Sequence, residues 1–192
     1  MKHEEKLSAN VGKKILVVVD VQNDFVKGGV LAYGFPQKSN TESIVAYAKH
    51  ILDGGNYIIA TRDTHHDNYF DTLEGKNLPI KHCIHQTKGW ELVDGLKELF
   101  YKGQIFDKPT FGTPLVAEQI RSIMEYEDID EIQLVGYDLS ICVLANAVLL
   151  RAHFPNKQIT VIPALCGDVD KKSFDAAIAV LRNQQIEIAD SI

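Results

Sequence analysis

Asp20, Lys108 and Cys142 are three residues whose types could together carry out a nucleophilic reaction. Cys142 stands at the start of a helix-like segment, where the helix dipole favours a thiolate. Lys108 is held extended by the following Pro109, and its ammonium group would stabilise the same thiolate. Asp20 could take the thiol proton and return it to a leaving amine. This combination is typical of amide hydrolysis through a thioester.

Each of the three residues also has an ordinary structural interpretation. Cysteine is among the residue types that are most often buried. An acid at a strand end is often a turn residue, and a lysine there is often solvated. Only the combination of the three favours chemistry, and it requires them to lie close together.

A second group of polar residues lies between residues 61 and 86, in "TRDTHHDNYFDTLEGKNLPIKHCIHQ". Asp63 and His65 form a D-x-H pattern after a strand-like segment, and Glu74 and His82 could reach the same point. Mixed imidazole and carboxylate ligands suit a divalent transition metal. The sequence leaves other ligands open, namely His66, Asp67, Asp71 and His85.

The elements that must position these residues alternate between strand and helix. Apolar runs predict strands over 14–20, 56–63, 104–108, 131–136, 158–163 and 186–189, and helical spacing predicts helices over 40–55, 89–100, 113–126, 141–154 and 171–184. Such alternation predicts an α/β protein with one parallel sheet and helices on both faces. Asp20, Asp63 and Lys108 then share the carboxyl edge of that sheet, where ligands bind in open sheets.

Length and composition narrow the organisation and the partners. Residues 1–12 lack periodicity and are predicted to be a flexible arm, and 192 residues suit a single domain over 13–192. A net charge of −6 without a basic cluster argues against nucleic acid or an anionic membrane as partner and favours a small neutral or cationic ligand. Three cysteines form no disulfide framework, and no apolar run reaches membrane-spanning length, so we expect a cytoplasmic protein.

Three motifs, "VVVDVQNDF", "FDKPTFG" and "GYDLSICV", resemble those of the isochorismatase-like cysteine hydrolases. The "DTH", "EGKNLPIKHC" and "GW" segments are similar to the nicotinamidase branch of that family. The resemblance implies a three-layer α/β/α, Rossmann-like fold with strand order 3-2-1-4-5-6. It also implies that Asp20, Lys108 and Cys142 form a catalytic triad.

Further site features follow from the resemblance alone. It implies a cis peptide bond between Tyr137 and Asp138, and an oxyanion hole made by the N–H groups of Asp138 and Cys142. It also implies that Phe25 stacks on the ring of the substrate, although Phe25 could instead be an ordinary core residue. It implies one divalent metal ion (Zn, Fe or Mn) on Asp63, His65, His82 and, less directly, Glu74. In the nicotinamidase branch this ion orients the pyridine nitrogen.

The sequence departs from the family pattern at two places. Leu139 and Ser140 occupy positions that often hold Thr and Asp, which puts substrate and rate in question. "LPIK" replaces an aromatic residue before the second histidine, so half of an aromatic sandwich is absent or comes from Tyr69, Phe70, Phe111 or Trp90.

These observations predict a metal-containing cysteine amidohydrolase that converts nicotinamide to nicotinate and ammonia. The alternative within the enzyme class is a metal-free amidase acting on a carbamoyl or ureido small molecule. A catalytically silent binding module is the alternative outside it. Either enzyme would take a small-molecule amide, and we expect a homo-oligomer because related enzymes often self-associate.

Overall fold

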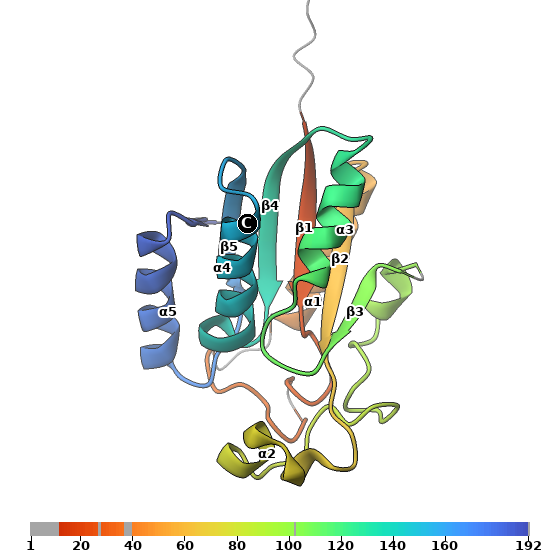
Figure 1. Ribbon diagram of the computed structural model, residues 1–192, viewed down its shortest axis with the longest axis vertical. Coiled ribbons are helices and arrows are strands. Elements are labelled where there is room, and N and C mark those ends of the chain that lie inside the picture. Colours follow the sequence, from red (N-terminus) through yellow and green to blue (C-terminus); the bar gives the residue numbers. More distant parts are fainter. Residues whose placement is uncertain (1–11, 27, 37–39, 102, 192) are drawn as a thin grey trace, which may run out of the picture.

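The computed structural model describes residues 12–26, 28–36, 40–101 and 103–191. Within these residues six parallel strands form one sheet in the order β3-β2-β1-β4-β5-β6 (Figure 1). The strands are β1 (Lys13–Val19), β2 (Tyr57–Asp63), β3 (Ile105–Lys108), β4 (Ile129–Gly136), β5 (Gln158–Cys166) and β6 (Glu187–Ile188). The predicted fold class and strand order are confirmed.

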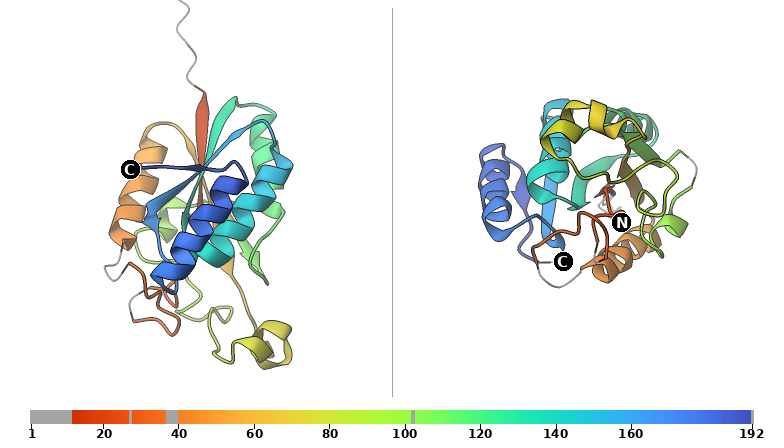
Figure 2. Two further views of the ribbon diagram at one scale, coloured as in Figure 1. Left: turned by 90° about the vertical axis from the view of Figure 1, so that its left-hand side faces the viewer. Right: turned by 90° about the horizontal axis from the view of Figure 1, so that it is seen from below.

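Helices cover both faces of the sheet (Figure 2, left). Helix α1 (Thr41–Asp53) lies on one face, and α3 (Leu115–Met124), α4 (Leu144–His153) and α5 (Lys171–Asn183) lie on the other. Strand β1 shows why its sequence is continuously apolar: Val17 packs toward α3 and α4, whereas Leu16 and Val18 pack toward α1. A strand buried on both faces has no side free for alternating polar residues.

The helix predicted over residues 89–100 does not form, apart from a 3₁₀ turn at Lys97–Leu99. The backbone of this segment makes a tertiary hydrogen bond instead, from the N–H of Val93 to the carbonyl of Val21 at 3.0 Å. Gly95 adopts a φ of +82°, which is not a helical conformation. Leu92 and Leu96 are nevertheless buried against the face of the sheet that α1 covers. The helical spacing of apolar residues here reflects the burial of an irregular segment. The prediction of a helix over residues 89–100 was therefore wrong.

The connection from β2 to β3 passes over the carboxyl edge of the sheet, seen from below in Figure 2 (right). It contains a short helix that the sequence did not predict, α2 (Leu73–Asn77), whose N-terminus is capped by the Thr72 hydroxyl accepting from the Gly75 N–H at 3.0 Å. At the same edge a five-residue π-helix, Leu139–Val143, leads into α4 and carries Cys142. Both elements therefore stand where the predicted site residues converge.

The predicted flexible arm, residues 1–12, lies outside the described residues except for Gly12. In the part of the chain that the structure describes, no helix is both long and apolar enough to cross a membrane.

Gly136 ends β4 and allows the close approach of β1 on which the site depends. Its φ is +123°, and a Cβ placed there would lie 2.0 Å from the Val19 carbonyl oxygen. We expect Gly136→Ala to lower the free energy of unfolding by roughly 2–4 kcal/mol, from backbone strain and the clash together. Gly103→Ala is the matched control, because Gly103 also has a positive φ of +96° but open space around it. Chemical denaturation that gives both variants the same loss would contradict this explanation.

Candidate active site

Asp20, Lys108 and Cys142 meet at the carboxyl edge of the sheet. The Lys108 Nζ lies 2.6 Å from the Asp20 Oδ2 and 3.5 Å from the Cys142 Sγ. Asp20 and Lys108 are fully buried, and Cys142 is 6% exposed. The Thr61 hydroxyl, on β2, donates to the Asp20 Oδ1 at 2.6 Å. The strand order brings these residues together, since Asp20 follows β1, which lies in the sheet between β3, which ends at Lys108, and β4, which leads to Cys142.

The electrostatics of this group suit proton transfer. Burial raises the pKa of Asp20 despite the nearby Lys108 ammonium. Burial and the negative charge of Asp20 likewise raise the pKa of the Cys142 thiol, against the lowering effect of Lys108. For Lys108, burial lowers the pKa, but Asp20, Cys142 and Asp63 together outweigh burial and raise the pKa above its usual value. The resting group therefore has a charged lysine and an acid that binds a proton more readily than an ordinary aspartate.

The turn before Cys142 contains the expected cis peptide bond between Tyr137 and Asp138. The two departures from the family pattern also have defined places. Leu139 is fully buried, and its N–H donates to the Gly167 carbonyl at 2.8 Å. Ser140 donates twice to the fully buried Asp168, from its N–H at 2.7 Å and from its hydroxyl at 2.8 Å. The serine therefore anchors the turn to the residues that follow β5.

Asp168 is a positioning residue that sequence reasoning missed. Besides Ser140, its carboxylate accepts the Val169 N–H at 2.7 Å. Its backbone pairs in both directions with Phe35, at 2.7 and 2.9 Å, in the segment that continues from the cavity wall at Gly34. Nothing in the local sequence marks this acid, because its partners lie about 30 and 130 residues away in the chain.

The predicted metal ligands Asp63, His65, Glu74 and His82 form one cluster. One ligand atom from each lies within 4.8 Å of the others, and the Asp63 Oδ2 lies 2.9 Å from the His65 Nε2 and 3.2 Å from the His82 Nε2. The Glu74 Oε1 lies 3.5 Å from the His65 Nε2. The structure therefore assembles Glu74, carried by α2, with the other three residues, whereas the alternative ligands His66 and Asp71 lie outside this cluster.

The chemistry of the cluster fits a divalent transition metal. The His82 Nδ1 lies 2.8 Å from the Ile80 carbonyl, to which it can donate, so that its Nε2 is left to face the cluster. Burial lowers the pKa of His65, but hydrogen bonds with Asp63 and Glu74 outweigh it and raise the pKa to about 9. The pocket thus stabilises positive charge, which a metal ion would supply on binding in place of the proton.

Asp63 is held by the two histidines of the cluster and by Gln22, a neighbour that the sequence did not indicate. Burial raises its pKa, but hydrogen bonds with His65 and His82 outweigh it and keep the pKa well below its usual value. The side-chain amide of Gln22 brackets its backbone, donating to the Asp63 carbonyl at 2.9 Å and accepting the Asp63 N–H at 2.7 Å. Gln22 therefore fixes the end of β2 that carries the first ligand.

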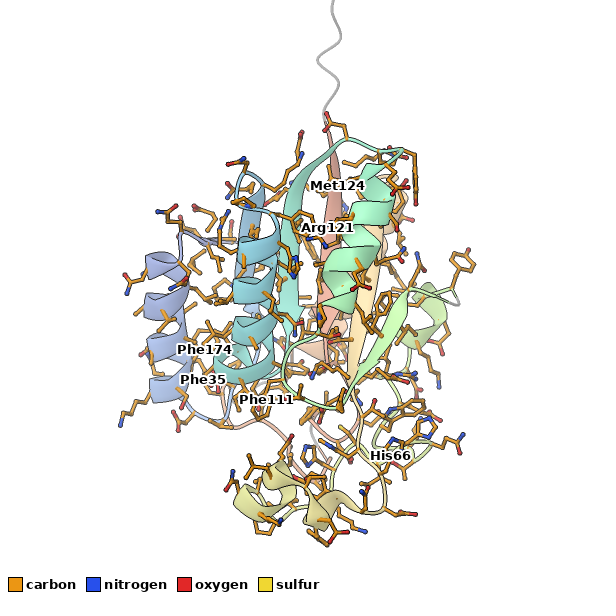
Figure 3. All side chains as sticks on the ribbon, viewed as in Figure 1. Phe35, His66, Phe111, Arg121, Met124 and Phe174 are labelled. Carbon is orange, nitrogen blue, oxygen red and sulfur yellow. The ribbon has the colours of Figure 1, made fainter. Side chains whose placement is uncertain are left out.

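A cavity of about 350 Å³ connects the cysteine with the metal-ligand cluster. Its polar lining comes from Asp63, Glu74, His82, Asp138 and Cys142. The apolar lining includes Phe25 and Phe111, and Phe111 lies between the sheet and α2 (Figure 3).

The structure separates the four aromatic residues that could complete a sandwich with Phe25. Phe111 lines the cavity. Tyr69 is fully buried and packs against the histidine rings, with its ring centroid 4.8 Å from that of His65. Trp90 stacks on the Arg62 guanidinium instead, and Phe70 is 51% exposed. Among the described candidates, Phe111 is the one placed to contact a ligand together with Phe25.

Removal of a ligand side chain tests the metal-ligand cluster. We expect wild-type protein to bind about one divalent ion per chain and His82→Ala to bind it more than roughly 100-fold more weakly, because a ligand and its oriented imidazole are both lost. His85→Ala is the matched control, since the His85 ring packs on Trp90 outside the cluster. Elemental analysis and metal titration measure this, and equal metal binding by the two variants would contradict the assignment.

The chain belongs to the isochorismatase family, because the sequence model of the Isochorismatase domain matches residues 14–192. The nicotinamidase/pyrazinamidase of Mycobacterium tuberculosis is 26% identical over 196 residues, which covers 93% of this chain and 99% of the relative.

Solved structures of similar proteins point the same way. The pyrazinamidase/nicotinamidase of Streptococcus mutans is 25% identical with a TM-score of 0.77 and covers 92% of this chain and 100% of that one. The pyrazinamidase of Pyrococcus horikoshii in complex with zinc shares the fold, with a TM-score of 0.72 and 21% identity. The match covers 92% of this chain and 98% of that one. The resemblance to the nicotinamidase branch is confirmed, which supports the predicted class of enzyme, a hydrolase of amide C–N bonds.

Proposed function

We propose that this protein is a metal-containing nicotinamidase, which hydrolyses nicotinamide to nicotinate and ammonia through a thioester on Cys142. The observation that carries the proposal is that one cavity joins the thiol of Cys142 to the metal-ligand cluster. The thiol accounts for the reaction class, and the cluster accounts for a heteroaromatic ring with a nitrogen atom. A metal-free amidase would not need four converging ligands, so the cluster favours the nicotinamidase over that alternative.

The first half of the reaction forms the thioester. Asp20 accepts the thiol proton, and the sulfur attacks the amide carbon while Lys108 stabilises the negative charge on the thiolate. The N–H groups of Asp138 and Cys142 stabilise the oxyanion of the tetrahedral intermediate. Asp20 then returns the proton to the amide nitrogen, the C–N bond breaks, and ammonia leaves.

The second half releases the acid. Asp20, again a carboxylate, accepts a proton from a water molecule whose oxygen attacks the thioester carbon. The C–S bond breaks, the thiol is restored with the proton from Asp20, and nicotinic acid leaves and loses its own proton to water as nicotinate. The raised pKa of Asp20 suits this alternation, because a general acid–base group works best when its pKa approaches the working pH.

The metal-ligand cluster would orient the substrate. A Zn, Fe or Mn ion held by Asp63, His65, Glu74 and His82 would supply a Lewis acid for the pyridine nitrogen. The zinc complex of the Pyrococcus horikoshii relative supports such an ion here. Phe25 and Phe111 would then contact the faces of the ring.

Ammonia release from two amides tests the proposal. We expect metal-replete enzyme to hydrolyse nicotinamide and to hydrolyse benzamide, which has the same shape without the ring nitrogen, at least about 100-fold less efficiently, since orientation is lost. No ammonia from nicotinamide would overturn the substrate assignment. Equal kcat/KM for both amides would instead favour the metal-free alternative.

A further inference from the structure

The side chain of Asp138 lines the cavity, and the mechanism above uses only its backbone N–H. Its Oδ1 is buried without a hydrogen-bond partner among the described residues. The neighbouring acids differ: Asp20 pairs with Thr61 and Lys108, and Asp168 accepts from Ser140. Asp138 is therefore an acid of this edge whose Oδ1 is left without a donor.

An unsatisfied buried acceptor is costly to the protein, and a ligand that supplies the missing donor removes that cost. The pKa of the Asp138 carboxyl group agrees with the lack of a hydrogen-bond donor. Burial, with repulsion from Asp168 and Asp20, raises the pKa of Asp138 to about 7. His82, which also lines the cavity, opposes this rise, and the described lining contains neither lysine nor arginine.

The composition and size of the cavity limit what could bring that donor. The cavity that Asp138 lines is mainly apolar, with Phe25, Leu31, Leu78, Phe111 and Ile141 among its walls. Its other acids, Asp63 and Glu74, disfavour a negatively charged ligand. About 350 Å³ lies at the lower end of the range for ligand sites, so a single ring with a small substituent fits this volume.

We propose that Asp138 is a specificity-determining residue whose carboxyl group accepts a hydrogen bond from a second N–H donor of the substrate. The preferred substrates are then heteroaromatic carboxamides that bear a small amino substituent on the ring. This inference rests on the proposed function and names the substrate class more narrowly. It assigns the Asp138 side chain a role separate from that of its backbone N–H.

Pairs of substituted nicotinamides test the inference. The 2-, 5- and 6-amino derivatives are each compared with the methyl derivative substituted at the same position, which has a similar size and no donor. We expect wild-type enzyme to prefer the amino compound at one of these positions by roughly 10- to 100-fold in kcat/KM. The readout is the ratio within one variant, so that a general change in activity cancels.

Two variants and a control assign the preference to the side chain. In Asp138→Ala the ratio should fall to about one, and in Asp138→Asn, which keeps an acceptor oxygen, part of the preference should remain. Asp67→Ala removes an exposed acid outside the cavity and should retain the wild-type ratio. An amino-to-methyl ratio that is unchanged in Asp138→Ala, or a wild-type ratio near one at all three positions, would overturn the inference.

Binding to a Cys142→Ala protein separates this inference from the proposed function. Calorimetry with the same pairs measures recognition without turnover, and tighter binding of an amino compound that is lost on adding Asp138→Ala supports the role of Asp138. If nicotinamide is hydrolysed but no pair shows this difference, only the inference fails. If nicotinamide is not hydrolysed and the amino compounds show no tighter binding, both fail.

Discussion

Replacement of Cys142 by alanine should abolish hydrolysis of nicotinamide, with a loss in kcat of at least about 10³-fold. Removal of a nucleophile leaves only the binding and electrostatic contributions of the site, which cannot form a covalent intermediate. The substitution is small and the residue is buried, so the fold should persist. Ammonia release by equal amounts of folded wild-type and variant protein measures the effect.

Cys83 and Cys166 provide the matched controls for this loss. Both are buried, and burial raises the pKa of each thiol. Among the described residues the lysine that hydrogen-bonds a cysteine sulfur is Lys108, and it does so at Cys142. Cys83→Ala and Cys166→Ala should therefore keep turnover within about 10-fold of wild type, apart from effects of cavity formation on stability. A Cys142→Ala enzyme as active as either control would contradict the assignment of the nucleophile.

Asp20→Asn should lower kcat by roughly 10²- to 10⁴-fold, because the amide cannot accept and return the proton. It should also destabilise the protein by about 3–5 kcal/mol, since the Lys108 ammonium would remain buried without its partner at 2.6 Å. The double variant Asp20→Asn, Lys108→Met removes that charge and should recover stability without recovering activity. Thermal unfolding and ammonia release on the same samples distinguish the two effects.

The pH profile of the wild-type enzyme provides a second readout of Asp20. The residue must be a carboxylate to accept the thiol proton, so kcat/KM should fall as the pH falls through its pKa. Because burial raises that pKa, the acidic limb should lie above the range of an ordinary aspartate, near 3.9. An acidic limb at or below that value would contradict the role given to Asp20.

The sequence predicted the fold well because its strongest signals reflect burial within single elements. The run of apolar residues in β1 has one interpretation, a strand covered on both faces, and the alternation of strands and helices then predicts a parallel sheet. The helix expected over residues 89–100 does not form, because apolar spacing does not report tertiary hydrogen bonds. Apolar spacing there was correct for burial, but the hydrogen bond from Val93 to Val21 depends on a tertiary contact.

The candidate site was predictable to the extent that its residues follow strands. Asp20, Asp63 and Lys108 are placed by strand ends, and Cys142 by the start of a helix. Glu74 and His82 were among several candidate ligands, and the resemblance to a family selected them. Asp168 and the unpartnered Oδ1 of Asp138 escaped prediction, because only the packed structure shows which carboxylate oxygens have donors and which have none.

Trapping of the acyl-enzyme tests the central claim, amide hydrolysis through Cys142, most directly. Metal-replete enzyme is mixed with nicotinamide, quenched in acid during turnover and examined by intact mass spectrometry followed by peptide mapping. We predict a protein species heavier by one nicotinoyl group, carried by the peptide that contains Cys142 and absent from Cys142→Ala. Turnover without any acylated protein, or acylation at Cys83 or Cys166 instead, would contradict the mechanism.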